Sequence, residues 1–280
     1  MLTAADINDM RCSFVADPFI VRKNAEWFMF FEIMSAETGR GEVGLATSRD
    51  GLSWKYHSSV LRERFHLSYP HVFAWNGGYF MVPEAYGENA IVLYQALCFP
   101  FEWRRMANLV EGVFADATPF HFEGRWWMFA CSTPYQHDTL RLYHSKDLTG
   151  PWIEHPLSPV VVKNAKAARP GGRVIPFNGG LIRYAQDCSR YYGYQLRAFE
   201  ITRLNSAEYR ERECSESPVL TPGLGWNEAG MHHADPHLVE QGLWLACVDG
   251  YRFDRDRQDE GAPSRRPILS RLSGWLGRET

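Results

Sequence analysis

Short apolar and aromatic runs alternate with polar turns along most of the chain. In "ADPFIVRKNAEWFMFFE", at 16–32, two such runs flank an Asn-containing turn. β-Branched and aromatic residues favour strands, and Asn, Gly and similar residues between them favour tight turns. The segment therefore predicts a β-hairpin. The same pattern opens five segments of the chain, at residues 16–32, 68–84, 115–131, 168–187 and 234–250.

The stretches between these segments predict further hairpins, as in "VGLATSRDGLSW" (43–54), "IVLYQALCFPFEW" (91–103) and "LRLYHSKDLTGPW" (140–152). Each unit then has about four strands and recurs at roughly fifty residues, the spacing of a propeller blade. We predict an all-β fold, a five-bladed β-propeller with a central funnel, over residues 1–250. A two-sheet β-sandwich with chance similarity between the segments is the alternative.

Residues 251–280 break this pattern. The charged run "YRFDRDRQDEGAPS" is typical of a solvated loop, or of a lid over one face, and "RRPILSRLSGWLGRE" predicts a short amphipathic helix or a frayed tail. We therefore expect a charged loop and a C-terminal tail outside the propeller.

Composition narrows the classes of function. The 280 residues are 45% hydrophobic, which suffices for a large core, and the net charge of -3 argues against a nucleic acid partner. No run of about 18 apolar residues predicts a membrane span, and the first residues lack the pattern of a secretory signal. The six cysteines form no CxxC pair, which favours reduced, mostly buried thiols in a cytoplasmic protein.

The opening strand of each blade lines the channel of a propeller, so equivalent positions should meet. The second position of each copy holds Asp17, Tyr69, Asp116, Arg169 and Asp235, and two positions later the copies hold Phe19, His71, Thr118, Gly171 and His237. Carboxylates that share a funnel repel one another, which splits their pKa values and suits acid–base chemistry. The alternative is that these aspartates only cap backbone amides at the start of each strand.

The stretch "HHADPH", at 232–237, concentrates histidines in the last copy. Strand alternation predicts that His233, Asp235 and His237 point to one side. The H-H-x-x-x-H spacing does not lie on a predicted helix, which argues against a zinc site. We therefore assign these residues to hydrogen bonding beside a substrate pocket, and we predict no metal ligands and no cofactor. A structural calcium ion or ordered water on the channel axis is the remaining option, because oxygens ring it.

The second strands of the hairpins end in further acids: Glu32, Glu84, Asp187 and Asp249. Glu84 follows Pro83, which limits strand pairing, and lies on the same predicted hairpin as His71. We therefore select Glu84 as a candidate site residue and expect Glu32 to be exposed on the surface.

The motifs "ADPF", "DATPF" and "SRDGLSW", with the count of five blades, resemble the five-bladed glycoside hydrolases of families 43 and 32. The set "FHLSYPHVF", "MVPE", "ARPGGRV" and "HHADPH" is more similar still to the N-terminal propeller domain of plant glucosamine inositolphosphorylceramide transferases. The resemblance spans about residues 12–250 and implies a glycan-handling funnel.

The resemblance to family 43 enzymes implies that Asp17 corresponds to their general base. It also implies that Asp116 corresponds to the aspartate that tunes the pKa of a neighbouring catalytic group and orients the sugar. The Glu that supplies the proton on blade four is replaced by Arg169. Ordinary glycoside hydrolysis needs two carboxyl groups. Without the blade-four acid, it would require Glu84 or Asp235 to act as the proton donor from another blade. A phosphate leaving group would need no acid and would pair with Arg169 and Arg173.

Two hypotheses follow. The first is an enzyme that acts on a glycosidic or sugar-phosphate bond, with Asp17, Asp116 and Glu84 as catalytic residues. The carbohydrate or sugar-phosphate ligand would contact His71, Tyr69, Arg169, Arg173, His233, Asp235 and His237. The second is a non-catalytic glycan-binding or accessory propeller, and a scaffold without ligand ranks last. Arg169 paired with the acids would favour binding, and open carboxyl groups roughly 5–10 Å apart would favour an enzyme.

Overall fold

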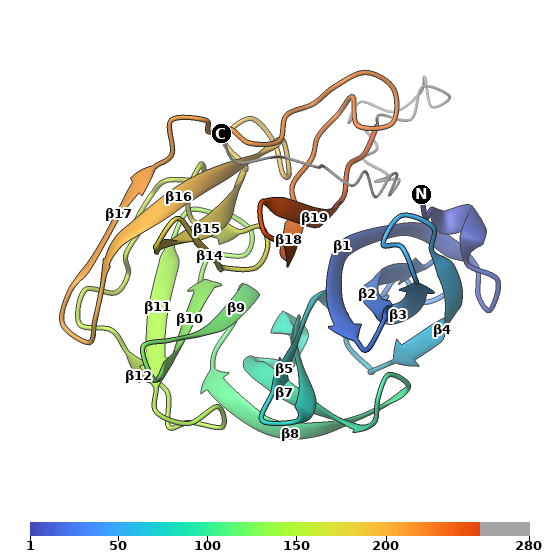
Figure 1. The fold of residues 1–280 in the computed structure, drawn as a ribbon, viewed down its shortest axis with the longest axis horizontal. Coiled ribbons are helices and arrows are strands. Elements are labelled where there is room, and N and C mark those ends of the chain that lie inside the picture. The colour runs from blue at the N-terminus through green and yellow to red at the C-terminus, as the bar shows by residue number, and fades with distance from the viewer. Residues whose placement is uncertain (253–280) are drawn as a thin grey trace.

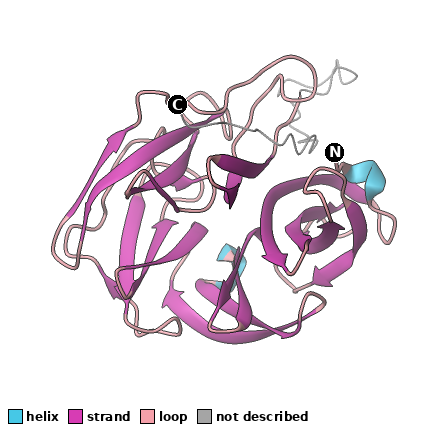
Figure 2. Ribbon diagram, viewed as in Figure 1, coloured by secondary structure: helices cyan, strands magenta, loops and turns pink. Residues whose placement is uncertain are grey.

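The structure is a computed structural model and describes residues 1–252. Antiparallel sheets stand around a common centre in a propeller arrangement (Figures 1 and 2), which confirms the predicted all-β fold. Helix is confined, in these residues, to two single turns, η1 (Ala4–Asp6) and η2 (Tyr86–Glu88). The predicted loop and tail at 253–280 lie outside the described residues.

Three sheets have the expected four strands in sequential order. The first contains β1 (Cys12–Lys23), β2 (Glu26–Ser35), β3 (Gly41–Ser48) and β4 (Lys55–Leu61). The second contains β5 (Ser68–Trp75), β6 (Gly78–Glu84), β7 (Ala90–Cys98) and β8 (Glu102–Glu111). The third contains β9 (Ala115–Phe122), β10 (Arg125–Cys131), β11 (Leu140–Ser145) and β12 (Ile153–Glu154).

The last two sheets depart from the regular unit. In the fourth, the inner strand is split into β13 (Arg169–Pro170) and β14 (Ile175–Phe177), followed by β15 (Gly180–Asp187), β16 (Gln195–Leu204) and β17 (Tyr209–Glu213). The fifth has two strands within the described residues, β18 (Ala234–Glu240) and β19 (Leu243–Val248). The inner strand of the fourth sheet splits at "GGR", because glycine lets the backbone leave the strand conformation.

Tight turns explain why the predicted hairpins form where they do. Asn76-Gly77, Glu123-Gly124 and Asn178-Gly179 each have two consecutive positive φ angles. Such two-residue turns match the right-handed twist of the flanking strands, so they favour hairpins. The turn chemistry in the sequence thus specifies the second, third and fourth hairpins locally.

The inner strands form a ring. β1 contacts β5 and β18, β5 contacts β9, and β9 contacts β13. A parallel bridge between Gly172 and Ala234 joins the fourth sheet to the fifth. Apolar clusters fill each space between neighbouring sheets; for example, Ile20 and Trp27 of the first sheet pack with Leu245 of the last. The chain therefore closes on itself, and inner-strand residues far apart in sequence meet near the axis.

Gly172 shows how closely the inner strands approach. Its φ is +141°, and a Cβ atom there would lie 1.8 Å from the Ala234 carbonyl oxygen. We expect Gly172→Ala to lower the free energy of unfolding by about 3 kcal/mol, through backbone strain and overpacking. Gly124→Ala is the control: its φ is +72° with nothing within 4 Å, so only about 1 kcal/mol of strain is expected. Urea unfolding compares the two, and equal losses would contradict the prediction.

No helix of the described residues is long and apolar enough to cross a membrane. All six cysteines are unpaired; Cys131 and Cys247 are buried, and Cys98 is exposed. The unpaired cysteines fit the expectation of reduced thiols. The expectation that most of them are buried holds for only some of the six.

Candidate functional site

In three of the five copies, the repeated phrase at the start of the blade carries a backbone irregularity. Asp17, Tyr69 and Asp116 have φ angles of 52°, 46° and 52°, and strand pairing shifts register at each of these positions. Such a bulge re-aims a side chain and bends the strand. Asp235 pairs regularly with Cys247 instead, so its side chain is not presented in the same way.

Arg169 meets acids from two neighbouring sheets, Asp116 of β9 and Glu84 of β6. Arg169 Nε donates to Asp116 Oδ2 at 2.6 Å, and Nη2 donates to Glu84 Oε2 at 3.0 Å. Nη1 donates to the Pro134 carbonyl oxygen at 3.1 Å, and the guanidinium lies 4.9 Å from the ring centre of Tyr192. Arg169 is therefore held by acids of the second and third sheets.

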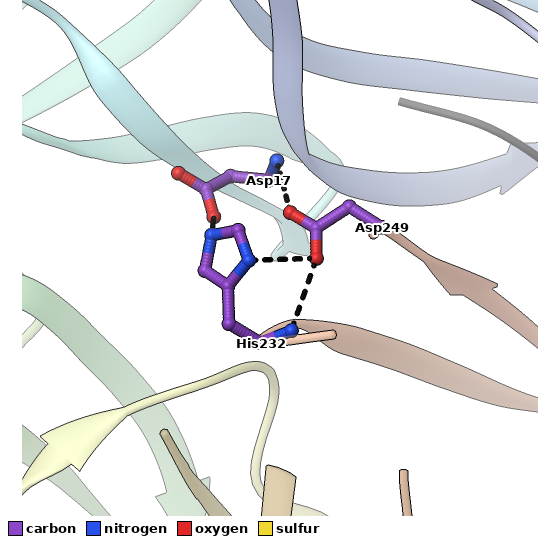
Figure 3. Close-up of side chains that lie close together, drawn as sticks. All are labelled: Asp17, His232 and Asp249. Carbon is purple, nitrogen blue, oxygen red and sulfur yellow. Dashed lines mark hydrogen bonds and ion pairs between the residues drawn. The ribbon is translucent and has the colours of Figure 1, made fainter. Parts of the chain in front are cut away.

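A second group joins the two ends of the described chain (Figure 3). His232 Nε2 lies 3.3 Å from Asp17 Oδ1, and His232 Nδ1 lies 3.1 Å from Asp249 Oδ1. The Asp17 amide also donates to Asp249 Oδ2 at 3.1 Å. Burial opposes the negative charge of Asp17, but His232 outweighs this effect and lowers the pKa of Asp17. Burial also opposes a positive charge on His232, but Asp249 and Asp17 raise the pKa of its imidazole well above the usual value.

Glu32 was expected on the surface, and that expectation is wrong. It is only 5% exposed, and its Oε1 lies 3.5 Å from His66 Nε2. Its position on β2 opposite Ala16 directs it to the same region as Asp17, and the approach of Gly41 and His66 covers it. Burial, reinforced by the charges of Asp17 and Glu84, raises the pKa of Glu32 well above its usual value.

These residues form what we call the acidic cluster: Asp17, Glu32, Glu84, Asp116 and Asp249, with Arg169 and His232. Each of these side chains exposes 8% or less of its surface. Burial, then the charges of Glu84 and Asp17, raise the pKa of Asp116, while Arg169 opposes this. The cluster therefore acts as one electrostatic unit assembled from every part of the ring.

A few residues further along the inner strands lies a separate group, the Arg173 cluster: Arg173, Asp235, His237 and His71. Asp235 accepts hydrogen bonds from Arg173 Nε at 2.7 Å, His237 Nε2 at 2.9 Å and the Ile20 amide at 2.6 Å. Arg173 also donates to the Val72 carbonyl oxygen at 2.9 Å. His71 is buried beside them, and neither ring nitrogen has a hydrogen-bond partner among residues 1–252.

An aromatic layer separates the two clusters. The Phe19 ring lies 4.8 Å from Tyr69 and 4.6 Å from His233, measured between ring centres. The Tyr69 hydroxyl accepts from the Gly172 amide at 2.8 Å and lies 2.9 Å from Thr118 Oγ1. Tyr69 and His233 are completely buried, so they fill the channel between the clusters.

The prediction that the second positions of the five copies meet in one place is therefore wrong for Asp235, which pairs with Arg173. Asp17, Glu84, Asp116 and Arg169 share the acidic cluster, whereas Asp235, Arg173, His71 and His237 lie at another level. Regular pairing at Asp235 explains the difference, because the bulge that aims Asp17 and Asp116 is absent there. His233 and Asp235 both meet β1, as strand alternation predicts: His233 Nε2 lies 3.0 Å from the Pro18 carbonyl oxygen, and Asp235 accepts from the Ile20 amide.

Two proposed roles change with this geometry. Asp235 was a candidate proton donor, but Arg173, His237 and the Ile20 amide already bind it, and the Arg173 charge lowers its pKa despite burial. Arg173 was a candidate phosphate ligand, but it is paired with Asp235. Sequence reasoning missed His232 as a member of the acidic cluster and did not assign Glu32 or Asp249 to it. The signal was present, since both acids end second strands of the repeat.

Asp17, His232 and Asp249 can also hold a cation, since a ligand atom from each lies within 4.8 Å of the others. The set contains an imidazole and only two carboxylates, whereas calcium takes six to eight oxygens. The three ligand types therefore fit a nitrogen-binding divalent ion better than the calcium ion that the sequence left as an option.

The sheets arranged around a common centre define the class of this protein as a β-propeller, with acids of its first and second strands converging near the axis. Residues 1–251 match the family described as "Glucosamine inositolphosphorylceramide transferase 1, N-terminal", and the chain belongs to this family. It is 33% identical over 273 residues to glucosamine inositolphosphorylceramide transferase 1 of Oryza sativa subsp. japonica, covering 95% of this chain and 36% of the relative. The protein of that name from Arabidopsis thaliana is 33% identical over 269 residues, covering 93% and 34%.

The chain thus spans about a third of the length of these curated relatives. Among solved structures, it is similar to the catalytic domain of an alpha-L-arabinofuranosidase of glycoside hydrolase family 62 from Coprinopsis cinerea, with a TM-score of 0.69, 12% identity and coverage of 94% and 90%. An alpha-L-arabinanase from Cellvibrio cellulosa gives a TM-score of 0.60, 14% identity and coverage of 85% and 86%. These similarities support the fold.

Proposed function

We propose that this protein is a glycan-binding propeller that holds a sugar without cleaving it and serves as an accessory to glycosyl transfer. The observation that carries this proposal is Arg169. It occupies the position at which the resemblance to family 43 places a proton donor, and it is locked between Asp116 and Glu84.

The contacts of Arg169 support the loss of a general acid. A guanidinium does not release a proton at physiological pH. Glu84, the candidate replacement, accepts from Arg169 with Oε2 and from Ser68 Oγ with Oε1, at 3.0 and 3.1 Å. Both of its oxygens therefore act as acceptors, and neither is placed to protonate a leaving oxygen.

The charge of the acidic cluster supports a neutral or amine-bearing sugar as the ligand. The cluster joins five carboxylic acids with two basic side chains, and Arg169 and Arg173 are already paired with acids. A phosphate would meet carboxylates rather than free guanidinium groups. The relatives are named for glucosamine, a sugar that carries an amine, which agrees with this preference.

The test is a panel of neutral glycosides, amino sugars and sugar phosphates, measured both for ligand-induced thermal shift and for release of aglycone or reducing sugar. We expect a thermal shift with neutral or amino sugars, no release with any compound, and a weaker shift for Asp17→Asn. Turnover that Asp17→Asn abolishes would overturn the proposal, as would a thermal shift with sugar phosphates alone.

One observation favours hydrolysis as a second candidate function. Glu32 has a raised pKa and Asp17 a lowered one, and such a split between neighbouring carboxyl groups is typical of acid–base catalysis. If the protein is a hydrolase, Glu32→Gln and Asp17→Asn should both abolish turnover. Glu208→Gln, on the exposed end of the fourth sheet, is the matched control and should leave turnover unchanged.

A further inference from the structure

The contact between the first and last sheets holds buried polar atoms that the proposed function leaves unused. Asp17 Oδ1, His232 Nδ1 and His233 Nδ1 are buried and have no hydrogen-bond partner within the described part of the chain. The two ring nitrogens of His232 nevertheless lie 3.3 Å from Asp17 Oδ1 and 3.1 Å from Asp249 Oδ1. These atoms are close, but they are not aligned as donor and acceptor.

The tautomer of His233 shows that Asp17 Oδ1 faces a second buried hydrogen-bond acceptor. His233 Nε2 lies 3.0 Å from the Pro18 carbonyl oxygen, which can only accept, so Nε2 carries the proton in the neutral ring. The Nδ1 lone pair then faces Asp17 Oδ1 at 3.9 Å. Two buried acceptors that face each other are unfavourable without a positive group beside them, and either a doubly protonated His232 ring, whose Nε2 lies 3.3 Å from Asp17 Oδ1, or a bound cation supplies it.

We propose that Asp17, His232 and Asp249 bind a divalent transition-metal ion of the zinc type. Figure 3 shows the three side chains converging, and a ligand atom from each lies within 4.8 Å of the others. Imidazole and carboxylate are the ligands that zinc accepts at structural and catalytic sites. His233 Nδ1 supplies a further nitrogen on the Asp17 side.

Such an ion would join the ends of the propeller. Asp17 belongs to β1, whereas His232 and Asp249 flank β18 and β19 of the last sheet. The Asp17 amide and the His232 amide both donate to Asp249, at 3.1 and 3.4 Å, which holds this carboxylate in place as a ligand. The ion would therefore stabilise closure of the ring independently of any sugar.

The test uses the full chain stripped of metal and titrated with Zn²⁺, Mn²⁺ or Ca²⁺ in the absence of sugar. We expect Zn²⁺ to bind at one ion per chain and to raise the melting temperature, and Ca²⁺ to bind weakly. His232→Gln and Asp249→Asn should each weaken Zn²⁺ binding by about 100-fold or more. His121→Gln, which removes an exposed imidazole, should leave it unchanged.

Equal binding in all variants, preference for Ca²⁺, or no binding would overturn the proposal and favour an ordered water or the protonated imidazole as the occupant. If either variant fails to fold, the visible spectrum of Co²⁺ bound to the wild type provides the readout. Loss of that spectrum on addition of Zn²⁺ supports the site, and absence of any spectrum overturns it. Because no sugar is present, failure here is distinct from failure of the proposed glycan binding.

Discussion

Asp235→Asn should lower the free energy of unfolding by about 4 kcal/mol. Asp235 is completely buried and accepts hydrogen bonds from Arg173, His237 and the Ile20 amide, which lie in three different sheets or connections of the ring. Removal of one member of a buried ion pair leaves an uncompensated charge, which typically costs about 3–5 kcal/mol. The loss should appear as a lower urea midpoint, and the fold of the variant is checked by near-UV circular dichroism.

The matched control is Glu200→Gln, which breaks the exposed pair with Arg212, joined at 2.7 Å. Exposed pairs contribute about 0–1 kcal/mol, so this variant should unfold almost as the wild type does. If Asp235→Asn and Glu200→Gln lose similar amounts, the Arg173 cluster does not stabilise closure of the ring.

Acid should remove the advantage of the wild type over Asp235→Asn. The Arg173 charge lowers the pKa of Asp235 in the folded protein below the value of about 3.9 expected when unfolded. Stabilisation by the ionised carboxylate is thus complete above about pH 4 and is lost as the pH falls through the folded pKa. The difference between the two proteins should therefore be constant near neutral pH and shrink below pH ~4.

Arg169→Met should cost about 4 kcal/mol of unfolding free energy, because it leaves Asp116 and Glu84 buried without their shared cation. The triple variant Arg169→Met with Asp116→Asn and Glu84→Gln should recover most of this loss, since the buried charges are then removed together. A loss of the same size in the triple variant would show that Arg169 stabilises through packing rather than charge.

The stability advantage of the wild type over Arg169→Met should also shrink as the pH falls, but it should do so at a higher pH than the advantage over Asp235→Asn. Burial already raises the pKa of Asp116, and loss of the guanidinium removes what opposes that rise. A carboxyl whose folded pKa lies above its unfolded pKa destabilises the fold when ionised, and the penalty fades as the pH falls. The gap between wild type and Arg169→Met should therefore narrow from pH 7 toward pH 5, measured by thermal unfolding at each pH.

The strands were predictable because their causes are local. Alternation of apolar and polar residues, and the Asn-Gly turn at 76–77, depend on residues within a few positions of one another, so the hairpins could be recognised from the chain alone. The repeat of these hairpins then predicted a propeller, and the sheet arrangement confirms it. The two strands of the last sheet within residues 1–252 and the split inner strand of the fourth could not be anticipated from the average repeat.

The site was predicted in part for the same reason. Asp17 and Asp116 share a repeated phrase, and the shared phrase gives a shared bulge, so both reach the acidic cluster. Asp235 has the same phrase without the bulge and pairs with Arg173 instead. Glu32 was expected on the surface because no local sequence pattern indicates that Gly41 and His66 lie against it in the folded chain.

Residue order alone specified the strands, the turns, the repeat and the types of residue offered to the axis. Tertiary structure decided which charges meet: Asp17 with His232 and Asp249, Arg169 with Asp116 and Glu84, and Arg173 with Asp235. These partners come from different sheets and meet only when the ring closes. Burial then sets the energy of each pair, because a charge removed from water depends on its nearest partner far more than on its neighbours in the chain.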